Sequence, residues 1–164
     1  MKEYYPILCK HGAKTLYLIY VSTSVDYILS KHSNHIAFTS FEKCKMFIVD
    51  NKLLPFHEDE LGVFNFDVID KFIKNNGKTD FSREVLDCWD LFDDIGENNT
   101  KYWADYWKKS EELRDLHEKL FFEIDVFNSG DIVKSCWDSS DLLLVKDLLE
   151  FGLMLFNQHL HIEE

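Results

Sequence analysis

The run Thr15–Val21, with the sequence TLYLIYV, constrains the fold of this chain more than any other segment. It is short, apolar and rich in β-branched and aromatic residues, which is typical of a strand buried on both faces. Between it and the earlier apolar run Tyr5–Cys9 lies Lys10-His11-Gly12-Ala13, a sequence that favours a turn. We therefore expect these two runs to pair as neighbouring strands.

Further short apolar runs follow in the first half of the chain. Val25–Leu29 and His35–Phe38 are separated by a polar segment that includes Lys31-His32-Ser33-Asn34, and with the first two runs they predict an antiparallel meander. Leu61–Phe66 predicts one more short strand. Between the runs His35–Phe38 and Leu61–Phe66, Thr39 and Glu42 have the spacing of a capping box, in which the two side chains satisfy amide groups at the start of a helix.

Helical periodicity dominates the second half of the chain. One helix is expected to begin at Asp67, and a second to run from Ser82 to Ile95 and to stop at Gly96. A third is expected to cover about residues 100–122, with a break near Ser110. The last is expected to begin at Ser139 or Ser140 and to end at about His159. This order of elements predicts an α+β fold, with a small N-terminal antiparallel sheet followed by a helical C-terminal half. The length of 164 residues predicts a single domain, residues 1–164.

The charge is distributed unevenly between the two halves. Residues 1–80 contain ten lysines and ten acidic residues, whereas residues 81–164 contain eight basic and twenty acidic residues and so carry all of the formal net charge of −12. Nucleic acids and anionic membranes are bound by clustered Lys and Arg, so we expect neither as a partner. A basic protein is the partner that this charge favours.

The segment Ser82–Ile95 concentrates this charge on one helix. Its apolar residues at helical spacing are Val85, Cys88, Trp89, Phe92 and Ile95. Its acidic residues, extended by Glu97, are Glu84, Asp87, Asp90, Asp93 and Asp94. Like charges at these spacings destabilise a helix, and acids near its C-terminal end oppose the helix dipole, so the pattern suggests a partner-binding face. The alternative is an ordinary solvated face of an acidic protein.

Aromatic residues follow the acidic helix. Trp103 and Trp107 are candidate anchors of a protein interface, since Trp supplies much contact area at low entropic cost. The alternative is packing beside a core stripe. That stripe is expected to comprise Tyr102, Tyr106, Leu113, Leu116 and Leu120. The loop residues His57–Glu60 are interpreted as an ordinary solvated loop.

Residues that carry chemistry do not form a recognisable motif. Cys9 and His11, with His32 and His35, could meet on adjacent turns, but neither spacing matches a common zinc module. His159 and His161 are interpreted as part of a fraying tail. The sequence contains no nucleophile elbow, phosphate loop or dinucleotide-binding motif. We expect no catalytic residue, no metal and no cofactor, and hence a non-enzymatic protein.

The N-terminus lacks the long apolar region of a signal peptide, and the four cysteines are far apart in sequence. We therefore expect a reducing cytoplasmic location, with the cysteines acting as small buried hydrophobic residues.

The segment Arg83–Asp94, REVLDCWDLFDD, resembles a stretch of small acidic bacterial immunity proteins of polymorphic toxin systems. The residues Glu118–Phe121, Trp137 and Leu148–Phe156 resemble the later part of the same pattern. The resemblance covers part of the second half and implies a non-enzymatic inhibitor that binds a cognate toxin domain. A toxin that attacks nucleic acid has a basic cleft, which an acidic face could occupy in place of phosphate.

Three functions are consistent with these patterns. The first is an immunity protein that neutralises a cognate toxin domain, such as a nuclease. The residues expected to bind the toxin are Glu84, Asp87, Asp90, Asp94 and Glu97, with Trp103 and Trp107 as anchors. The second is an adaptor or DNA-mimicking regulator that binds a basic host protein. The third is a small enzyme that uses the turn at Cys9 and His11 or the clustered carboxylates.

Overall fold

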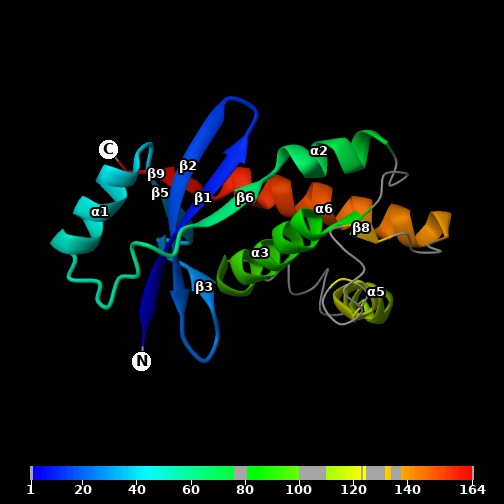
Figure 1. Ribbon diagram of the computed structural model, residues 1–164, viewed down its shortest axis with the longest axis horizontal. Coiled ribbons are helices and arrows are strands. Elements are labelled where there is room, and N and C mark those ends of the chain that lie inside the picture. Colours follow the sequence, from blue (N-terminus) through cyan, green and yellow to red (C-terminus); the bar gives the residue numbers. More distant parts are fainter. Residues whose placement is uncertain are drawn as a thin grey trace.

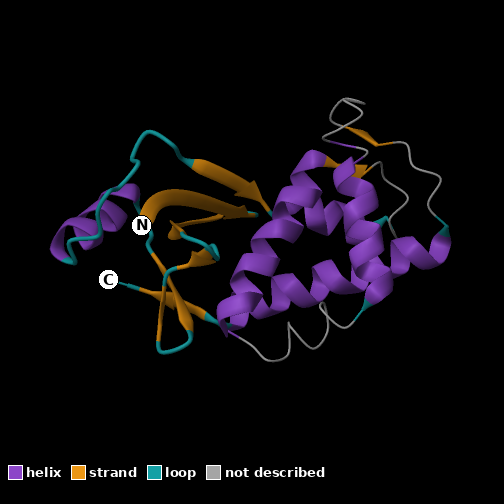
Figure 2. Cartoon of the chain, turned by 90° about the horizontal axis from the view of Figure 1, so that it is seen from below, coloured by secondary structure: helices purple, strands orange, loops and turns teal. Residues whose placement is uncertain are grey.

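The structure is a computed structural model that describes residues 2–75, 81–99, 110–122, 124, 132–133 and 138–163. Its main sheet lies between one short helix on one face and a group of helices on the other (Figure 1). The view from below shows the same arrangement (Figure 2). The expected α+β class, with a sheet built from the N-terminal half and a helical C-terminal half, is confirmed.

The main sheet has the strand order β3-β2-β1-β6. Its strands are β1 (Glu3–His11), β2 (Lys14–Ser22), β3 (Tyr27–Ile28) and β6 (Gly62–Asn65). The predicted hairpin of β1 and β2 is confirmed, with His11 opposite Lys14 and Gly12 in the left-handed conformation (φ 58°) that a tight turn requires. Strand β6 pairs with β1 in parallel, which makes the sheet mixed.

The expected meander stops at β3. Strand β5 (Asn34–Ala37) lies in a second sheet, between β4 (Ser30–Lys31) and β9 (Leu160–Ile162). The prediction of a fraying tail is therefore wrong, because residues 160–162 pair in parallel with β5. A third, two-stranded sheet pairs β7 (Phe81–Ser82) with β8 (Ile132–Val133).

Strand β2 is covered on both faces, as its sequence predicts. Leu16 and Leu18 face the larger cluster of buried residues, while Ile19 and Val21 face a smaller cluster. Helix α1 (Phe41–Asp50) covers the smaller cluster through Cys44 and Ile48, which are buried. The capping prediction is wrong by one residue: the N-cap is Ser40, whose hydroxyl accepts a hydrogen bond from the Lys43 amide.

Four helices surround the larger cluster: α2 (Asp67–Lys74), α3 (Arg83–Asn99), α5 (Glu111–Phe121) and α6 (Ser139–Gln158). Helix α3 continues through Gly96, so the predicted stop is wrong; its intrahelical bonds outweigh the roughly 1 kcal/mol cost of an internal glycine. Helix α6 is capped by Asp138, which accepts from the Ser140 and Asp141 amides, and not by a serine.

Two other predicted helix starts can be compared with the structure. Asp67 lies in the first turn of α2, whose N-cap is Phe66, so Asp67 is not the cap. The predicted break near Ser110 is confirmed to the extent that Ser110 caps α5, with its hydroxyl accepting from the Leu113 amide. Residues 100–109 lie outside the described part of the chain. Among the described helices, none combines the length and apolar character needed to cross a membrane.

Candidate functional site

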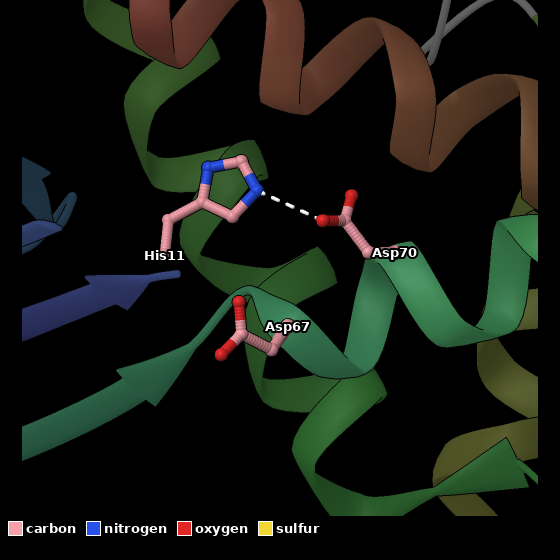
Figure 3. A group of neighbouring side chains, drawn as sticks. All are labelled: His11, Asp67 and Asp70. Atoms are coloured by element: carbon pink, nitrogen blue, oxygen red, sulfur yellow. Dashed lines mark hydrogen bonds and ion pairs between the residues drawn. The ribbon is translucent and has the colours of Figure 1, made fainter. Parts of the chain in front are cut away.

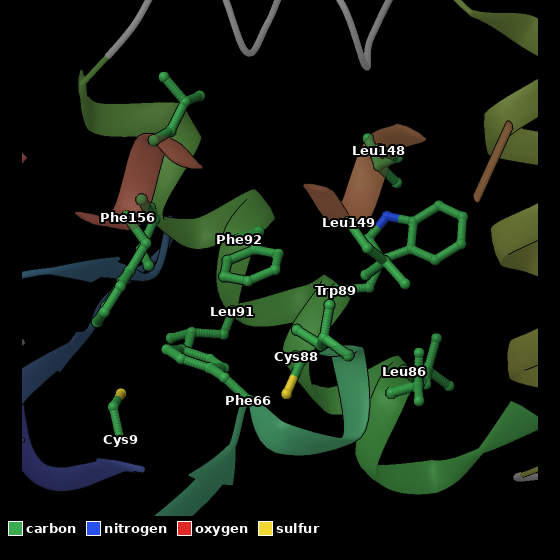
Figure 4. Close-up of a cluster of buried hydrophobic side chains, with 14 of the residues drawn as sticks. Cys9, Phe66, Leu86, Cys88, Trp89, Leu91, Phe92, Leu148, Leu149 and Phe156 are labelled. Carbon is green, nitrogen blue, oxygen red and sulfur yellow. The ribbon is translucent and has the colours of Figure 1, made fainter. Parts of the chain in front are cut away.

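Helix α3 is held in place by the apolar residues that its periodicity predicts. All five of them, Val85, Cys88, Trp89, Phe92 and Ile95, are buried. The Phe92 ring packs against Phe66, with 5.5 Å between the ring centroids (Figure 4). Leu86 and Leu91, which the periodicity did not assign to the core, are buried as well. Helix α3 is therefore covered on more than one side, and its acidic residues differ in exposure: Glu84 and Asp90 are exposed, whereas Asp87, Asp93 and Asp94 are half-buried.

A groove of about 440 Å³ lies between α3 and the sheet. Its walls come from β1, β2, β6, the loop before β6, and α3. The lining residues are Tyr5, Pro6, Ile7, Tyr20, Glu60, Gly62, Val63, Phe64, Asp87, Asp90, Leu91 and Asp94. Three of the predicted partner-binding acids therefore share one concave site with two tyrosines from strands more than 60 residues earlier in the chain.

Gly62 shapes the sheet side of this groove. A Cβ atom added there would lie 3.2 Å from Ile7 Cγ2 and 3.5 Å from Phe64 Cε2. The first contact is tight and the second is an ordinary van der Waals contact, so a side chain at this position would press on Ile7 and take up space in the groove. Glycine keeps the sheet wall open at the point where it faces α3.

The groove is strongly acidic. Four carboxylates line it, those of Glu60, Asp87, Asp90 and Asp94, and among the residues that the structure describes no Lys or Arg lines the groove. Burial, the hydrogen bond to Asp26 and the negative charge of Asp94 are among the causes that raise the pKa of Tyr20. A phenol whose pKa responds to the helix carboxylates indicates that their field crosses the groove to the sheet wall.

The tyrosines are held by their own partners. Tyr20 Oη donates to Asp26 Oδ2 at 2.7 Å, and Tyr5 Oη donates to Glu3 Oε2 at 2.8 Å. The hydrogen bond to Glu3, burial and the charges of neighbouring carboxylates, Glu60 included, raise the pKa of Tyr5. The His57 ring stacks on Tyr5 with 4.5 Å between centroids. These contacts fix two aromatic rings in the groove wall opposite the acids.

Asp90 also connects α3 to α5. His117 Nε2 donates to Asp90 Oδ1 at 2.6 Å, and the His117 ring lies edge-on to Trp89 with 5.1 Å between centroids. Asp90 therefore supports packing as well as the charge of the groove. Asp87 and Asp94, which are half-buried, line the same groove.

Of the other predicted partner-binding residues, the structure describes the side chain of Glu84 alone. Glu84 is exposed on α3 and is not among the residues that line the groove. The side chain of Glu97 and the residues Trp103 and Trp107 lie outside the described part of the chain. Of the predicted core stripe, Leu113, Leu116 and Leu120 are buried as expected, while Tyr102 and Tyr106 are likewise not described.

Sequence reasoning missed the sheet side of the groove. Glu60 was assigned to an ordinary solvated loop, but it lines the groove, and His57 of the same loop stacks on Tyr5. Tyr5 and Tyr20 occupy opposite positions of the β1–β2 hairpin, a pairing that the turn at Gly12 fixes. Alternation along the two runs could have placed both tyrosines on one face, but it could not have shown which helix lies across from them.

A second group of side chains lies at the other end of β1. The ligand atoms of His11, Asp67 and Asp70 all lie within 4.8 Å of one another (Figure 3). Within the described ranges this is the one group of three or more such residues that could hold a metal ion, so Cys9, His32 and His35 do not join His11. Sequence reasoning missed Asp67 and Asp70 because they belong to α2, more than 50 residues from His11.

Three of the four cysteines are described, and all three are buried and free: Cys9, Cys44 and Cys88. Burial raises the pKa of Cys44 to about 12, and it is also the main cause that raises the pKa of Cys9 and Cys88. Thiols of this kind are inert hydrophobic residues, as their dispersion in the sequence predicts. Cys136 lies outside the described residues.

No protein-family model matches the chain, and no curated protein matches it. A solved structure that is similar is the C-terminal domain of SatS, in complex with bromine, with a TM-score of 0.58 and 16% sequence identity. The match covers 98% of this chain and 94% of that chain. The similarity extends over the sheet and the helices together and shows a shared fold.

Proposed function

We propose that this chain is a non-enzymatic binding protein that neutralises a cognate toxin domain, with the groove between α3 and the sheet as the site that receives a basic segment of the toxin. The observation that carries the proposal is the convergence of Asp87, Asp90, Asp94 and Glu60 on one concave site, in which the described lining residues include no Lys or Arg. An acidic groove of this kind favours a basic partner.

The chemistry of the groove suits an arginine or lysine side chain. A guanidinium group binds carboxylates through paired, charge-assisted hydrogen bonds, and it also stacks on aromatic rings. The groove offers carboxylates on the α3 side and the rings of Tyr5 and Tyr20 on the sheet side. Its volume of about 440 Å³ can admit one or two side chains, which leaves the rest of the contact to the surrounding surface.

The uneven charge of the chain supports fast capture of such a partner. The formal charge of −12 belongs to residues 81–164, which include α3. Charge of one sign around a concave site attracts an oppositely charged partner and raises the association rate, most strongly at low salt. Glu84, exposed on the same helix, would contribute to this attraction without entering the groove.

The toxin part of the proposal rests on the resemblance of residues 83–94 to immunity proteins. A nuclease toxin carries a basic cleft for phosphate, and the carboxylates of this chain would compete for it. Such a toxin acts inside a cell, so the proposed place of action is the cytoplasm. Nucleic acid and membrane are not proposed partners.

The test is protection in a growing cell. An immunity gene lies beside its toxin gene, so the product of the adjacent gene is expressed in a test bacterium with and without this chain. We expect the neighbouring product to stop growth, and this chain to restore it. A variant with Asp87→Asn and Asp94→Asn should protect less well, whereas the matched control, Asp115→Asn with Glu118→Gln on the exposed side of α5, should protect fully.

Each result separates the possible roles. A toxic neighbour that this chain fails to counteract, or a neighbour without toxicity, would overturn the immunity role and leave an adaptor for a basic host protein as the better explanation. Full protection by the folded Asp87 and Asp94 variant would keep the immunity role and overturn the groove as its site.

A further inference from the structure

We propose that His11, Asp67 and Asp70 form a binding site for a divalent transition-metal ion, with Zn²⁺ as the ion that fits best. The site lies at the opposite end of β1 from Tyr5, on different residues from those of the acidic groove. It is independent of the proposed toxin binding. It also departs from the expectation of no metal, because the three residues come from separate elements that sequence spacing does not connect.

The fold brings the three side chains together from two directions. His11 is the last residue of β1, and Asp67 and Asp70 occupy the first turn of α2. Residues three apart in a helix share one side, so both carboxylates face the hairpin. Figure 3 shows the His11 ring turned toward Asp70, with the Asp67 carboxylate at the start of the helix.

The distances suit a metal site. Ligand atoms about 2.0–2.1 Å from a tetrahedral zinc ion lie about 3.3 Å from one another. His11 Nε2 and Asp70 Oδ2 are 3.1 Å apart, so this pair already has the separation of two adjacent ligands. All three ligand atoms lie within 4.8 Å of one another, so Asp67 is near enough for its carboxylate to move in as the third ligand when the ion binds.

The positions of the groups leave a coordination site open to water. The side chains of His11 and Asp70 are about one-third exposed, so solvent can reach the space between them. Asp67 Oδ1 accepts from the Gly12 amide at 2.7 Å, which orients this carboxylate and leaves its second oxygen for the ion. Three protein ligands with water in the fourth position form a common zinc arrangement.

The ligand types select the ion. One imidazole with two carboxylates is a mixed nitrogen and oxygen set, which suits Zn²⁺ and its neighbours in the first transition row. Ca²⁺ and Mg²⁺ prefer oxygen ligands alone and in larger number, so His11 makes the site poor for them. Two carboxylates balance the charge of one divalent ion. Without metal, the proton on His11 Nε2 lies in the hydrogen bond to Asp70. When the metal binds, it takes the place of this proton.

Binding would connect the β1–β2 turn to the start of α2. We expect the chain to bind one Zn²⁺ at this site, and the ion to raise the thermal midpoint because it binds the folded state. Calorimetric titration of the intact chain with ZnCl₂ is compared with titration of His11→Ala, Asp67→Asn and Asp70→Asn. The matched control is His32→Asn, which removes an exposed histidine from a turn with a φ of 52° that asparagine tolerates.

The expected result is a loss of affinity of about tenfold or more in each of the three variants and none in the control. MgCl₂ and CaCl₂ should bind far more weakly than ZnCl₂. Equal affinity in His11→Ala and wild type would overturn the site, since zinc would then be held elsewhere, and equal binding of Mg²⁺ would overturn the role of the imidazole. The first of these results would leave the three residues with a structural role alone, through the hydrogen bonds that connect the β1–β2 turn to α2.

A measurement on the unmodified chain keeps the proposal testable if a variant fails to fold. Imidazole nitrogen resonances are recorded by NMR during the zinc titration. We expect the His11 ring to shift first, at less than one equivalent. A first shift at His159 or His161, with His11 unchanged, would overturn the proposal.

Discussion

Gly152 tests how closely α3 and α6 are packed. A Cβ atom at this position would lie 2.4 Å from Phe92 Cδ2, 2.6 Å from Cγ and 3.0 Å from Cβ. Carbon atoms pack favourably at about 3.5–4.0 Å, so Gly152→Ala requires a displacement of about 1 Å between the helix backbone and the Phe92 ring. Phe92 is only 1% exposed and packs against Phe66, so its ring has little room to move.

Two opposing effects determine how Gly152→Ala changes the free energy of unfolding. Alanine in a helix interior gains about 1 kcal/mol over glycine, whereas overpacking a close-packed core costs about 1–3 kcal/mol. The contact at 2.4 Å is much shorter than any ordinary contact, so we place the cost at the upper end of that range. The net expectation for Gly152→Ala is a loss of about 1–2 kcal/mol in the free energy of unfolding.

Urea titration measures this loss as a lower midpoint at an unchanged slope. For a chain of this length the thermal midpoint should fall by about 2–4 °C per kcal/mol. Met154→Ala, at a partly exposed position of the same helix, is the control and should change stability by less than about 0.5 kcal/mol. Phe92→Leu should recover part of the loss in the Gly152→Ala background. A Gly152→Ala variant as stable as wild type would refute this account of the packing between α3 and α6.

Two further predictions concern the capping of α1 and the buried histidine of β5. Ser40→Ala should lower the free energy of unfolding by about 1 kcal/mol, because Ser40 is the N-cap of α1, whereas Thr39→Ala should not lower it. Equal losses for the two variants in urea titration would contradict the assignment of Ser40 as the cap. Burial, followed by the charge of His159, lowers the pKa of His35 to about 4, well below its ordinary value near 6.5. Between these two pH values the unfolded chain binds more protons than the folded chain, so the free energy of unfolding should fall by at most about 3 kcal/mol as the pH drops from about 6.5 to about 4. His35→Gln should lack this part of the dependence of stability on pH.

The parts of the fold that local patterns determine could be predicted. The β1–β2 hairpin follows from two apolar runs around Gly12, and the buried side of α3 follows from helical spacing. Helix ends were less certain, because Thr39 and Ser40 can both cap a helix and the choice depends on which hydroxyl meets the Lys43 amide.

The candidate sites depend on contacts between distant segments, and these could not be predicted. The groove forms because β6 pairs in parallel with β1, which places Gly62 opposite Ile7. About 50 residues of chain connect these two strands. The His11 group needs α2 to start where the β1–β2 turn ends. Charge spacing along α3 predicted three acids of the groove correctly as neighbours, but it could not indicate that the sheet lies across from them.

The most direct test of the central claim is the rate at which this chain binds the product of the adjacent gene, which we propose to be its cognate toxin domain. Association is measured at low and at physiological salt for wild type, for the Asp87→Asn and Asp94→Asn variant, and for the Asp115→Asn and Glu118→Gln control. If the groove receives a basic segment, loss of its two carboxylates should slow association by about tenfold at low salt and weaken affinity, while the control stays close to wild type. Equal rates and affinities for both folded variants would contradict the acidic groove as the binding site.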